Sequence, residues 1–184
     1  LEGETLQQLI LAGDHSRLTD GLGLMLHTVD TIWHGTLDKT PTHPKFLRQL
    51  EKRISKVVKV HPEFARPTTA IGDARYPGLL EAIEECKFLD TELIAPHRVL
   101  IHGDFNTDNI IINPEQRQVH YIDLHRSKLF DSAQDVSVFV VSNFRMPVSD
   151  GLLRERLDAV SVRFFEFGRG FAQRHDDTTF VARA

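Results

Sequence analysis

The chain has 184 residues, of which 41% are hydrophobic and 26% are charged, and its formal net charge is −4. This composition is typical of a globular domain with a sizeable core, and the negative charge excludes the basic footprint of a nucleic-acid-binding or membrane-surface protein. The single cysteine, Cys86, excludes a disulfide framework and a cysteine-based zinc site.

The first part of the chain predicts helices. A short helix follows Thr5, whose hydroxyl can accept a hydrogen bond from the first free amides. A clearer helix has apolar residues at steps of three and four from Leu18 to Trp33, and Gly35 is expected to end it. Prolines in residues 40–44 then predict a loop.

The middle of the chain predicts two more amphipathic helices, over residues 46–58 and 79–89. The first has a basic outer face and the second an acidic one. Both faces are interpreted as solvated surfaces, because the basic face has no interleaved aromatic residues and the total charge is negative. The stretch 61–77 contains prolines and Gly72, and it predicts a loop of the kind found in insertions and mobile segments.

The last part of the chain leaves one choice open. Residues 132–142 fit a strand by their β-branched content and a buried helix by their flanks, and periodicity does not separate the two. Pro147 breaks this run, and Ser149 or Asp150 is expected to cap a long amphipathic helix. Residues 174–184 lack periodicity and are expected to be loose.

The central stretch carries the chemistry. His102, Asp104 and Asn109 follow the spacing H-x-D-x-x-x-x-N after an aliphatic run, and a second aliphatic run ends on Asp123. Phosphoryl transfer to an alcohol needs a base at the acceptor hydroxyl and hard oxygen ligands for magnesium. The pattern therefore predicts Asp104 as the base and Asn109 and Asp123 as metal ligands on a β-hairpin. Taken alone, Asp104 would be read as a turn residue.

On these residues the chain resembles the aminoglycoside phosphotransferase/choline kinase-like superfamily, relatives of protein kinases that phosphorylate small molecules. Residues 102–109 are similar to its catalytic loop, Ile122-Asp123 to its metal-binding segment, and residues 131–135 to its D-P-x-x-D-L-A element. The resemblance implies the same base and magnesium ligands. It further implies that Ile111 and Ile122 form a floor under the adenine of ATP. His102 and Asp135 would give structural support to the loop.

The chain also departs from the superfamily's pattern. Asp108 stands where Gly is common, Asn106 replaces a frequent His, and Leu124-His125 follows where protein kinases have Phe-Gly. The run 123–126 also resembles lipopolysaccharide sugar kinases, which keeps the identity of the acceptor open. None of these departures removes a metal-ligand position.

The resemblance runs from Leu1 to about Phe171, and residues 1–6 are similar to the start of a hinge between two lobes. The glycine-rich loop, strand lysine and partner helix that grip phosphates in the superfamily are not found; Gly21-Leu-Gly23 lies inside a predicted helix. Because the chain does not begin with Met, we expect an excised fragment or the removal of a tag. We predict an α+β fold, a mostly helical kinase-like C-terminal lobe forming a single domain over residues 1–184, with the N-terminal nucleotide-clamping lobe absent.

The predicted function is magnesium-assisted transfer of the γ-phosphoryl group of ATP to a hydroxyl of an aminoglycoside, amino alcohol or sugar-like molecule. This fragment alone is expected to be poorly active or inactive. The alternative is a non-catalytic kinase-like scaffold or regulatory binding module, which the three retained site residues argue against and the missing lobe favours. The expected partners are a nucleotide, the acceptor, and a missing lobe or partner domain. We expect a cytoplasmic protein that binds neither nucleic acid nor a membrane.

Overall fold

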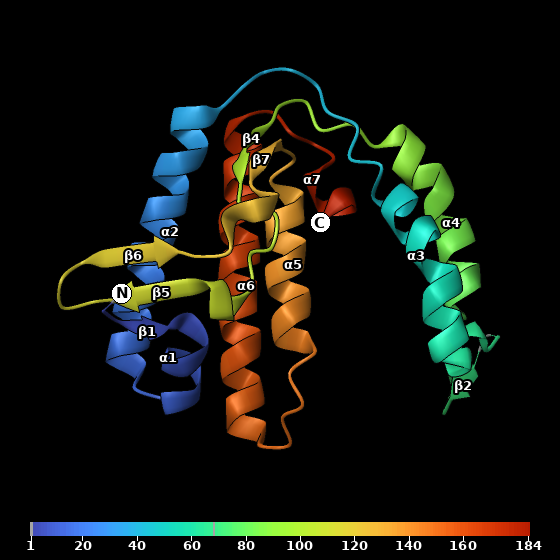
Figure 1. The fold of residues 1–184 in the computed structure, drawn as a ribbon, viewed down its shortest axis with the longest axis horizontal. Coiled ribbons are helices and arrows are strands. Elements are labelled where there is room, and N and C mark those ends of the chain that lie inside the picture. The colour runs from blue at the N-terminus through green and yellow to red at the C-terminus, as the bar shows by residue number, and fades with distance from the viewer. Residues whose placement is uncertain (1, 68) are drawn as a thin grey trace. The chain divides into compact units, whose positions relative to one another are not determined.

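The computed structural model describes residues 2–67 and 69–184, so Leu1, where the resemblance begins, lies outside the described residues. The chain divides into two compact units, one comprising the chain up to Thr42 together with Ala95–Ala184 and the other comprising His43–Ile94. Helices predominate, with small antiparallel sheets beside them (Figure 1). The predicted mostly helical α+β class is therefore confirmed.

The first unit contains most of the secondary structure. Its elements in chain order are β1 (Glu4–Thr5), α1 (Leu6–Ala12), α2 (His15–Thr36), β4 (Val99–Ile101), η2 (Thr107–Asn109), β5 (Ile110–Asn113), β6 (Gln118–Tyr121), η3 (Leu124–Arg126), β7 (Lys128–Phe130), α5 (Ala133–Phe144), α6 (Gly151–Arg174) and α7 (Phe180–Arg183). None of the helices in the described part of the chain combines the length and hydrophobicity that crossing a membrane requires.

Helix starts follow the caps expected from the sequence. The hydroxyl of Thr5 accepts from the N–H of Gln8 at 3.1 Å, and the N–H of Thr5 donates to the Gln8 side chain at 2.8 Å, which completes a capping box. Asp150 caps α6, because its Oδ1 accepts from the N–H of Leu153 at 2.9 Å. Gly35 lies inside α2 rather than after it, so the predicted end of that helix was wrong by a short distance.

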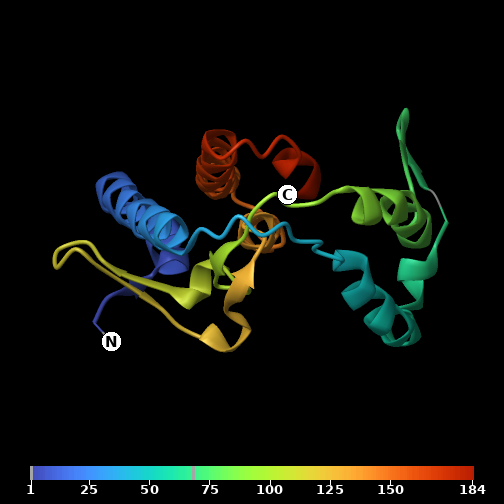
Figure 2. The same cartoon turned by 90° about the horizontal axis from the view of Figure 1, so that it is seen from above.

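The predicted hairpin forms as β5 and β6, which pair antiparallel with β1 on the other side of β5. Ile110 and Ile112 are fully buried, whereas Ile111 is half-buried on the opposite face and stands across from His120. The hairpin lies across α2 (Figures 1 and 2), and β4 pairs separately with β7. The strand alternation therefore fixes which hairpin side chains enter the core and which remain outside.

The core of this unit lies between α2, α5, α6 and the hairpin, and α5 packs beside α6 (Figure 1). The ambiguous stretch 132–142 is helical in α5, where Val136, Phe139 and Asn143 recur at helical spacing and are buried. Aromatic rings fill the centre, with Phe139 and Phe164 4.6 Å apart between ring centroids.

The end of the chain is ordered, so the prediction of loose residues at 174–184 was wrong. Phe180 is buried, and the guanidinium group of Arg183 forms ion pairs with the buried carboxylates of Asp131 and Asp177. A four-residue helix with one buried apolar residue is too short to show a hydrophobic period. Contacts with distant parts of the chain hold it in place.

The second unit contains the two predicted amphipathic helices and a small hairpin. Its elements are α3 (Phe46–Val60), η1 (Pro62–Ala65), β2 (Thr69–Ile71), β3 (Ala74–Tyr76) and α4 (Leu79–Glu92). β2 and β3 pair antiparallel around Gly72, which has a φ of +59°. The prediction of a plain loop over 61–77 was therefore wrong in this part, because Gly72 makes a tight turn accessible.

Candidate active site

A tight loop after β4 carries the predicted base, and its peptide N–H groups are all hydrogen-bonded. The N–H groups of His102 and Gly103 each donate to one oxygen of Asp135 at 2.8 Å. The N–H group of Asp104 donates to Nδ1 of His102 at 3.3 Å. The start of α5 therefore holds the loop through a single carboxylate.

The three carbonyl oxygens of the same loop are also paired. The carbonyl oxygen of His102 accepts from Oγ of Ser127 at 3.2 Å, and that of Gly103 accepts from Nε2 of Gln134 at 3.0 Å. The carbonyl oxygen of Asp104 accepts from Nδ2 of Asn109 at 2.9 Å. A buried peptide group left without a partner costs about 1–3 kcal/mol. A different loop conformation would break several of these hydrogen bonds at once, so the observed conformation is strongly favoured. Sequence patterns identified Asn109 but missed Ser127 and Gln134, whose roles depend on backbone contacts across the fold.

The ring of His102 connects the loop to the segment before Asp123. Its Nε2 lies 2.9 Å from the carbonyl oxygen of Ile122, while its Nδ1 accepts from the N–H of Asp104. A neutral imidazole with its hydrogen on Nε2 satisfies both contacts. Burial lowers the pKa of His102, which favours this neutral form.

Asp135 is buried in the first turn of α5. Burial raises the pKa of its carboxyl group to about 7, although the hydrogen bonds from Gly103 and His102 act in the opposite direction. The group that holds the loop therefore titrates near neutral pH.

Gly103 is required by its backbone conformation and by its neighbours. Its φ is +83°, and an added Cβ would lie 2.5 Å from the carbonyl oxygen of Arg126. We expect Gly103→Ala to lower the free energy of unfolding by about 1–3 kcal/mol in urea titrations. Gly23→Ala is the matched control, because an added Cβ in α2 meets nothing within 4 Å and alanine favours the helix by about 1 kcal/mol. Equal stability of the two variants would contradict a strained loop.

Phe105 anchors the loop to the core directly after the predicted base. It is buried, and its ring stacks on Phe164 with 5.2 Å between centroids and lies 5.7 Å from that of Tyr121. Sequence reasoning missed this residue, although a large apolar side chain inside a polar loop was the available signal. The anchor leaves the side chain of Asp104 partly exposed, at 24%.

Asn109 and Asp123 lie at the open end of the β5–β6 hairpin. Asn109 ends η2, and its carbonyl oxygen accepts from the N–H of Ile122 at 3.1 Å, so the two segments run side by side. Asp123 has a φ of +61°, uncommon for a residue other than glycine, which turns the chain away from the strand direction. Its side chain is half-exposed.

These two side chains fit a magnesium ion in their donor chemistry. Nδ2 of Asn109 is engaged by Asp104, which leaves its Oδ1 for a ligand, and Asp123 provides a carboxylate. Magnesium prefers hard oxygen ligands and commonly takes one or two from protein beside phosphates and water. Among the described residues no group of three or more His, Cys, Asp or Glu could hold a metal, so an ion here would depend on the bound nucleotide and on water.

Both predicted reactive carboxylates have partners from η3, which sequence reasoning missed. Nδ1 of His125 lies 2.7 Å from Oδ1 of Asp123, and Nη1 of Arg126 lies 3.3 Å from Oδ2 of Asp104. All four side chains are partly exposed, and such pairs typically contribute only about 0–1 kcal/mol. A bound ligand can therefore displace them at small cost.

The two residues predicted to lie under the adenine share the outer face of the hairpin. Ile111 lies across from His120, and Ile122 follows His120 by two residues, so all three side chains belong to the same side of the pleat. Both isoleucines are half-buried. The structure thus brings Ile111 and Ile122 to one face of the hairpin.

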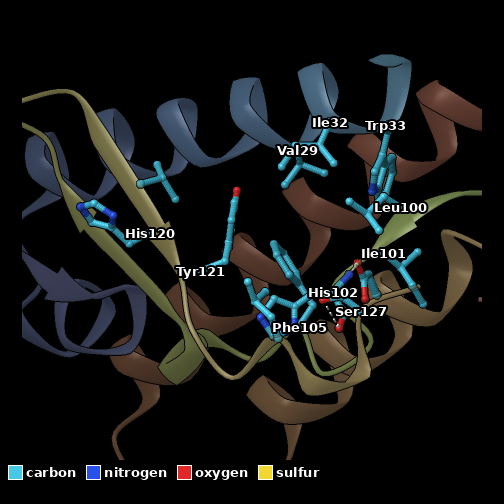
Figure 3. A pocket seen from close by; sticks show the side chains of 13 residues that line it. Val29, Ile32, Trp33, Leu100, Ile101, His102, Phe105, His120, Tyr121 and Ser127 are labelled. Atoms are coloured by element: carbon cyan, nitrogen blue, oxygen red, sulfur yellow. Dashed lines mark hydrogen bonds between the residues drawn. The ribbon is translucent and has the colours of Figure 1, made fainter. Parts of the chain in front are cut away.

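An apolar cavity of about 460 Å³ lies between α2, β4 and β6 (Figure 3). Val29, Ile32 and Trp33 border it from α2, and Tyr121 points toward it from the hairpin. Burial raises the pKa of Tyr121, and its hydroxyl has no hydrogen-bond partner among the described residues. The side chains of the predicted base and metal ligands do not line this cavity.

Comparison with protein-family models matches residues 12–173 to the phosphotransferase enzyme family, APH. This match covers most of the chain, and the chain therefore belongs to that family. A comparison with curated protein sequences gives no match.

Among solved structures, the chain is similar to a glucosamine kinase in complex with glucosamine, ADP and inorganic phosphate, with 17% identity and a TM-score of 0.49. This similarity covers 95% of the present chain and 45% of the kinase. A second crystal form of glucosamine kinase gives 16% identity, a TM-score of 0.49, and coverage of 96% and 45%. The chain thus spans less than half the length of these kinases.

Proposed function

We propose that the chain is the C-terminal lobe of a kinase that transfers the γ-phosphoryl group of ATP to a hydroxyl of a small molecule. The observation that carries this proposal is the fully hydrogen-bonded loop 102–104, which presents a partly exposed Asp104 next to Asn109 in a member of a phosphotransferase family. Rigid placement of a base is what this reaction requires, because the protein contributes mainly by positioning groups and stabilising charge.

In the proposed reaction, Asp104 accepts the proton of the acceptor hydroxyl. The acceptor oxygen forms a bond to the γ-phosphorus, the bond from that phosphorus to the β,γ-bridging oxygen breaks, and its electron pair remains on ADP. Asn109 and Asp123 would hold magnesium, which supplies neutralisation of phosphate charge when bound. Ile111 and Ile122 would form the floor under the adenine, and His102 and Asp135 would keep Asp104 in place.

We further propose that the groups gripping the nucleotide phosphates belong to an N-terminal lobe outside these 184 residues, and that the present residues act as one domain with it. The described site supports this division because it offers a base and oxygen ligands, while the basic groups in contact with those carboxylates, His125 and Arg126, are engaged by them. Activity should accordingly be measured on the complete reading frame that contains this chain.

Replacing the predicted base tests the proposed function. In the complete protein, Asp104→Asn is expected to lower kcat by about 10²–10⁴-fold, because the amide cannot accept the hydroxyl proton. Initial rates of ADP formation with a hydroxyl acceptor measure this loss. Asp108→Asn is the matched control, since Asp108 is an exposed carboxylate four residues further along the chain.

Unchanged kcat in the Asp104 variant would remove that residue as the base. Absence of acceptor-dependent ADP formation in the wild-type protein would instead favour a non-catalytic, kinase-like binding module. Unfolding in urea should be the same for the variant and wild type within about 0.5 kcal/mol, because the exchanged side chain is partly exposed.

A further inference from the structure

A second cavity, of about 370 Å³, lies directly beside the predicted base. It is lined by Asp104 and Asn106 of the loop, by four residues of α5 and by the residue that follows this helix: Ser137, Val138, Val141, Ser142 and Arg145. These positions recur at the spacing of one helical face, while the neighbouring Phe139 faces the core. The helix that holds the catalytic loop at its start therefore also provides the wall of a site next to Asp104.

The two serine hydroxyls of this cavity already donate within the chain, so the donors left for a ligand are Asn106 and Arg145. Oγ of Ser137 donates to the carbonyl oxygens of Ala133 and Ala184, and Oγ of Ser142 donates to that of Phe139, so neither hydroxyl hydrogen is available. Oδ1 of Asn106 accepts from the N–H of Asp108, which leaves its NH2 group as a donor.

The positive charge of the cavity comes from Arg145. Its guanidinium group forms no ion pair or side-chain hydrogen bond with any residue of the described part of the chain. Among the described residues, Asp104 provides the only acidic side chain that lines the cavity, and its Oδ2 lies 3.3 Å from Nη1 of Arg126. An acceptor with several amino groups would therefore bring like charges together and find one carboxylate to offset them.

Resting on the proposed function, we propose that the phosphoryl acceptor is an anionic monosaccharide, whose hydroxyl meets Asp104 and whose acidic group binds Arg145. Guanidinium groups bind carboxylates and phosphates through paired N–H donors. Ser137 and Arg145 are separated by eight residues, or about 12 Å of helix. The cavity, of about 370 Å³, has room for one sugar ring, so a sugar acid or sugar phosphate can present a hydroxyl and an anionic group to different parts of its lining.

The test compares acceptors on the complete protein, with ADP formation as the readout. Glucuronate and glucose 6-phosphate are the anionic probes, glucose is the neutral one, and glucosamine and kanamycin are the cationic ones. At least a tenfold higher kcat/KM is expected for one anionic sugar than for glucose, and the two anionic probes distinguish a carboxylate from a phosphate. Preference for glucose, glucosamine or kanamycin would overturn the acceptor class while leaving the proposed function standing.

Arg145→Met tests the role of the guanidinium. It is expected to raise the acceptor KM at least tenfold more for the anionic sugar than for glucose, while the KM for ATP stays unchanged. Arg163→Met, at an exposed position on α6, is the matched control. A rise confined to the KM for ATP would assign Arg145 to the nucleotide and overturn the proposal. No turnover with any probe would overturn the acceptor class.

Discussion

Replacing Arg183 with methionine is expected to lower the free energy of unfolding of this chain by about 3–5 kcal/mol. Nε of Arg183 lies 2.7 Å from Oδ2 of Asp131, and its Nη2 lies 2.6 Å from Oδ2 of Asp177. All three side chains are 1% exposed. Burial opposes the charge of the guanidinium, but hydrogen bonds with Asp177 and Asp131 raise the pKa of Arg183. Methionine would leave two buried carboxylates without compensation.

Urea unfolding of the 184-residue chain measures this effect. Arg163→Met is the control for loss of an arginine on the surface, and its effect should be within about 0.5 kcal/mol. A triple variant that adds Asp131→Asn and Asp177→Asn should recover part of the loss, because the cost arises from unpaired charge. A loss below about 1 kcal/mol in Arg183→Met would mean that the carboxylates find other partners or protonate readily.

The contact also links the end of the chain to the loop 102–104. Oδ1 of Asp131 accepts from the N–H of Ala133, the first residue of α5. Asp135 follows two residues later and holds the N–H groups of His102 and Gly103. Loss of the Arg183 ion pairs is therefore expected to disturb the start of α5, the helix whose Asp135 holds the loop.

Short-range sequence patterns predicted the helices, their caps and the hairpin, because neighbouring residues determine these features. The apolar period predicted α2 and α6, and the aliphatic runs on either side of a turn predicted the β5–β6 hairpin. The cap of α1 was predicted at Thr5, and Asp150, one of the two residues predicted to cap α6, does so. The spacing of His102, Asp104 and Asn109 likewise placed these residues on one loop, and the structure brings them together.

What the sequence could not predict depends on contacts between distant segments. Arg183 pairs with Asp131, 52 residues earlier, and no period marks such an ion pair. Ser127 and Gln134 bind backbone carbonyl groups of the loop, and their side-chain types do not distinguish this role from a surface one. The run 132–142 stayed ambiguous because a buried helix and a buried strand are both apolar, and tertiary packing decides between them.

Asp135→Asn is expected to change both the stability of the chain and its dependence on pH. Asparagine keeps the size of the side chain but has only one acceptor oxygen, so its NH2 group would face either the N–H of His102 or that of Gly103. One buried N–H would lose its partner, at a cost of about 1–3 kcal/mol. In the complete protein, kcat is expected to fall on the order of 100-fold, because a displaced loop moves Asp104 from its position.

The pH dependence follows from the raised pKa of Asp135, about 7 in the folded protein against 3.8 for an unperturbed aspartate. Between these values the folded chain keeps a proton that the unfolded chain has released. The contribution of this group to stability is therefore complete below about pH 4, falls as the pH rises, and is lost above about pH 7. The lowered pKa of His102 acts in the opposite direction, because its stabilising effect appears as the pH rises.

The difference in unfolding free energy between wild type and Asp135→Asn separates these two effects, since His102 is present in both proteins. Measured in urea from pH 5 to pH 8, the advantage of the wild type is expected to shrink by about 3 kcal/mol. An advantage that stays constant over this range would show that the two amide donors outweigh burial and hold the folded pKa of Asp135 well below 5. The carboxylate would then be ionised throughout the measured range, and the start of α5 would hold the loop that carries Asp104 by charge instead of titrating near neutrality.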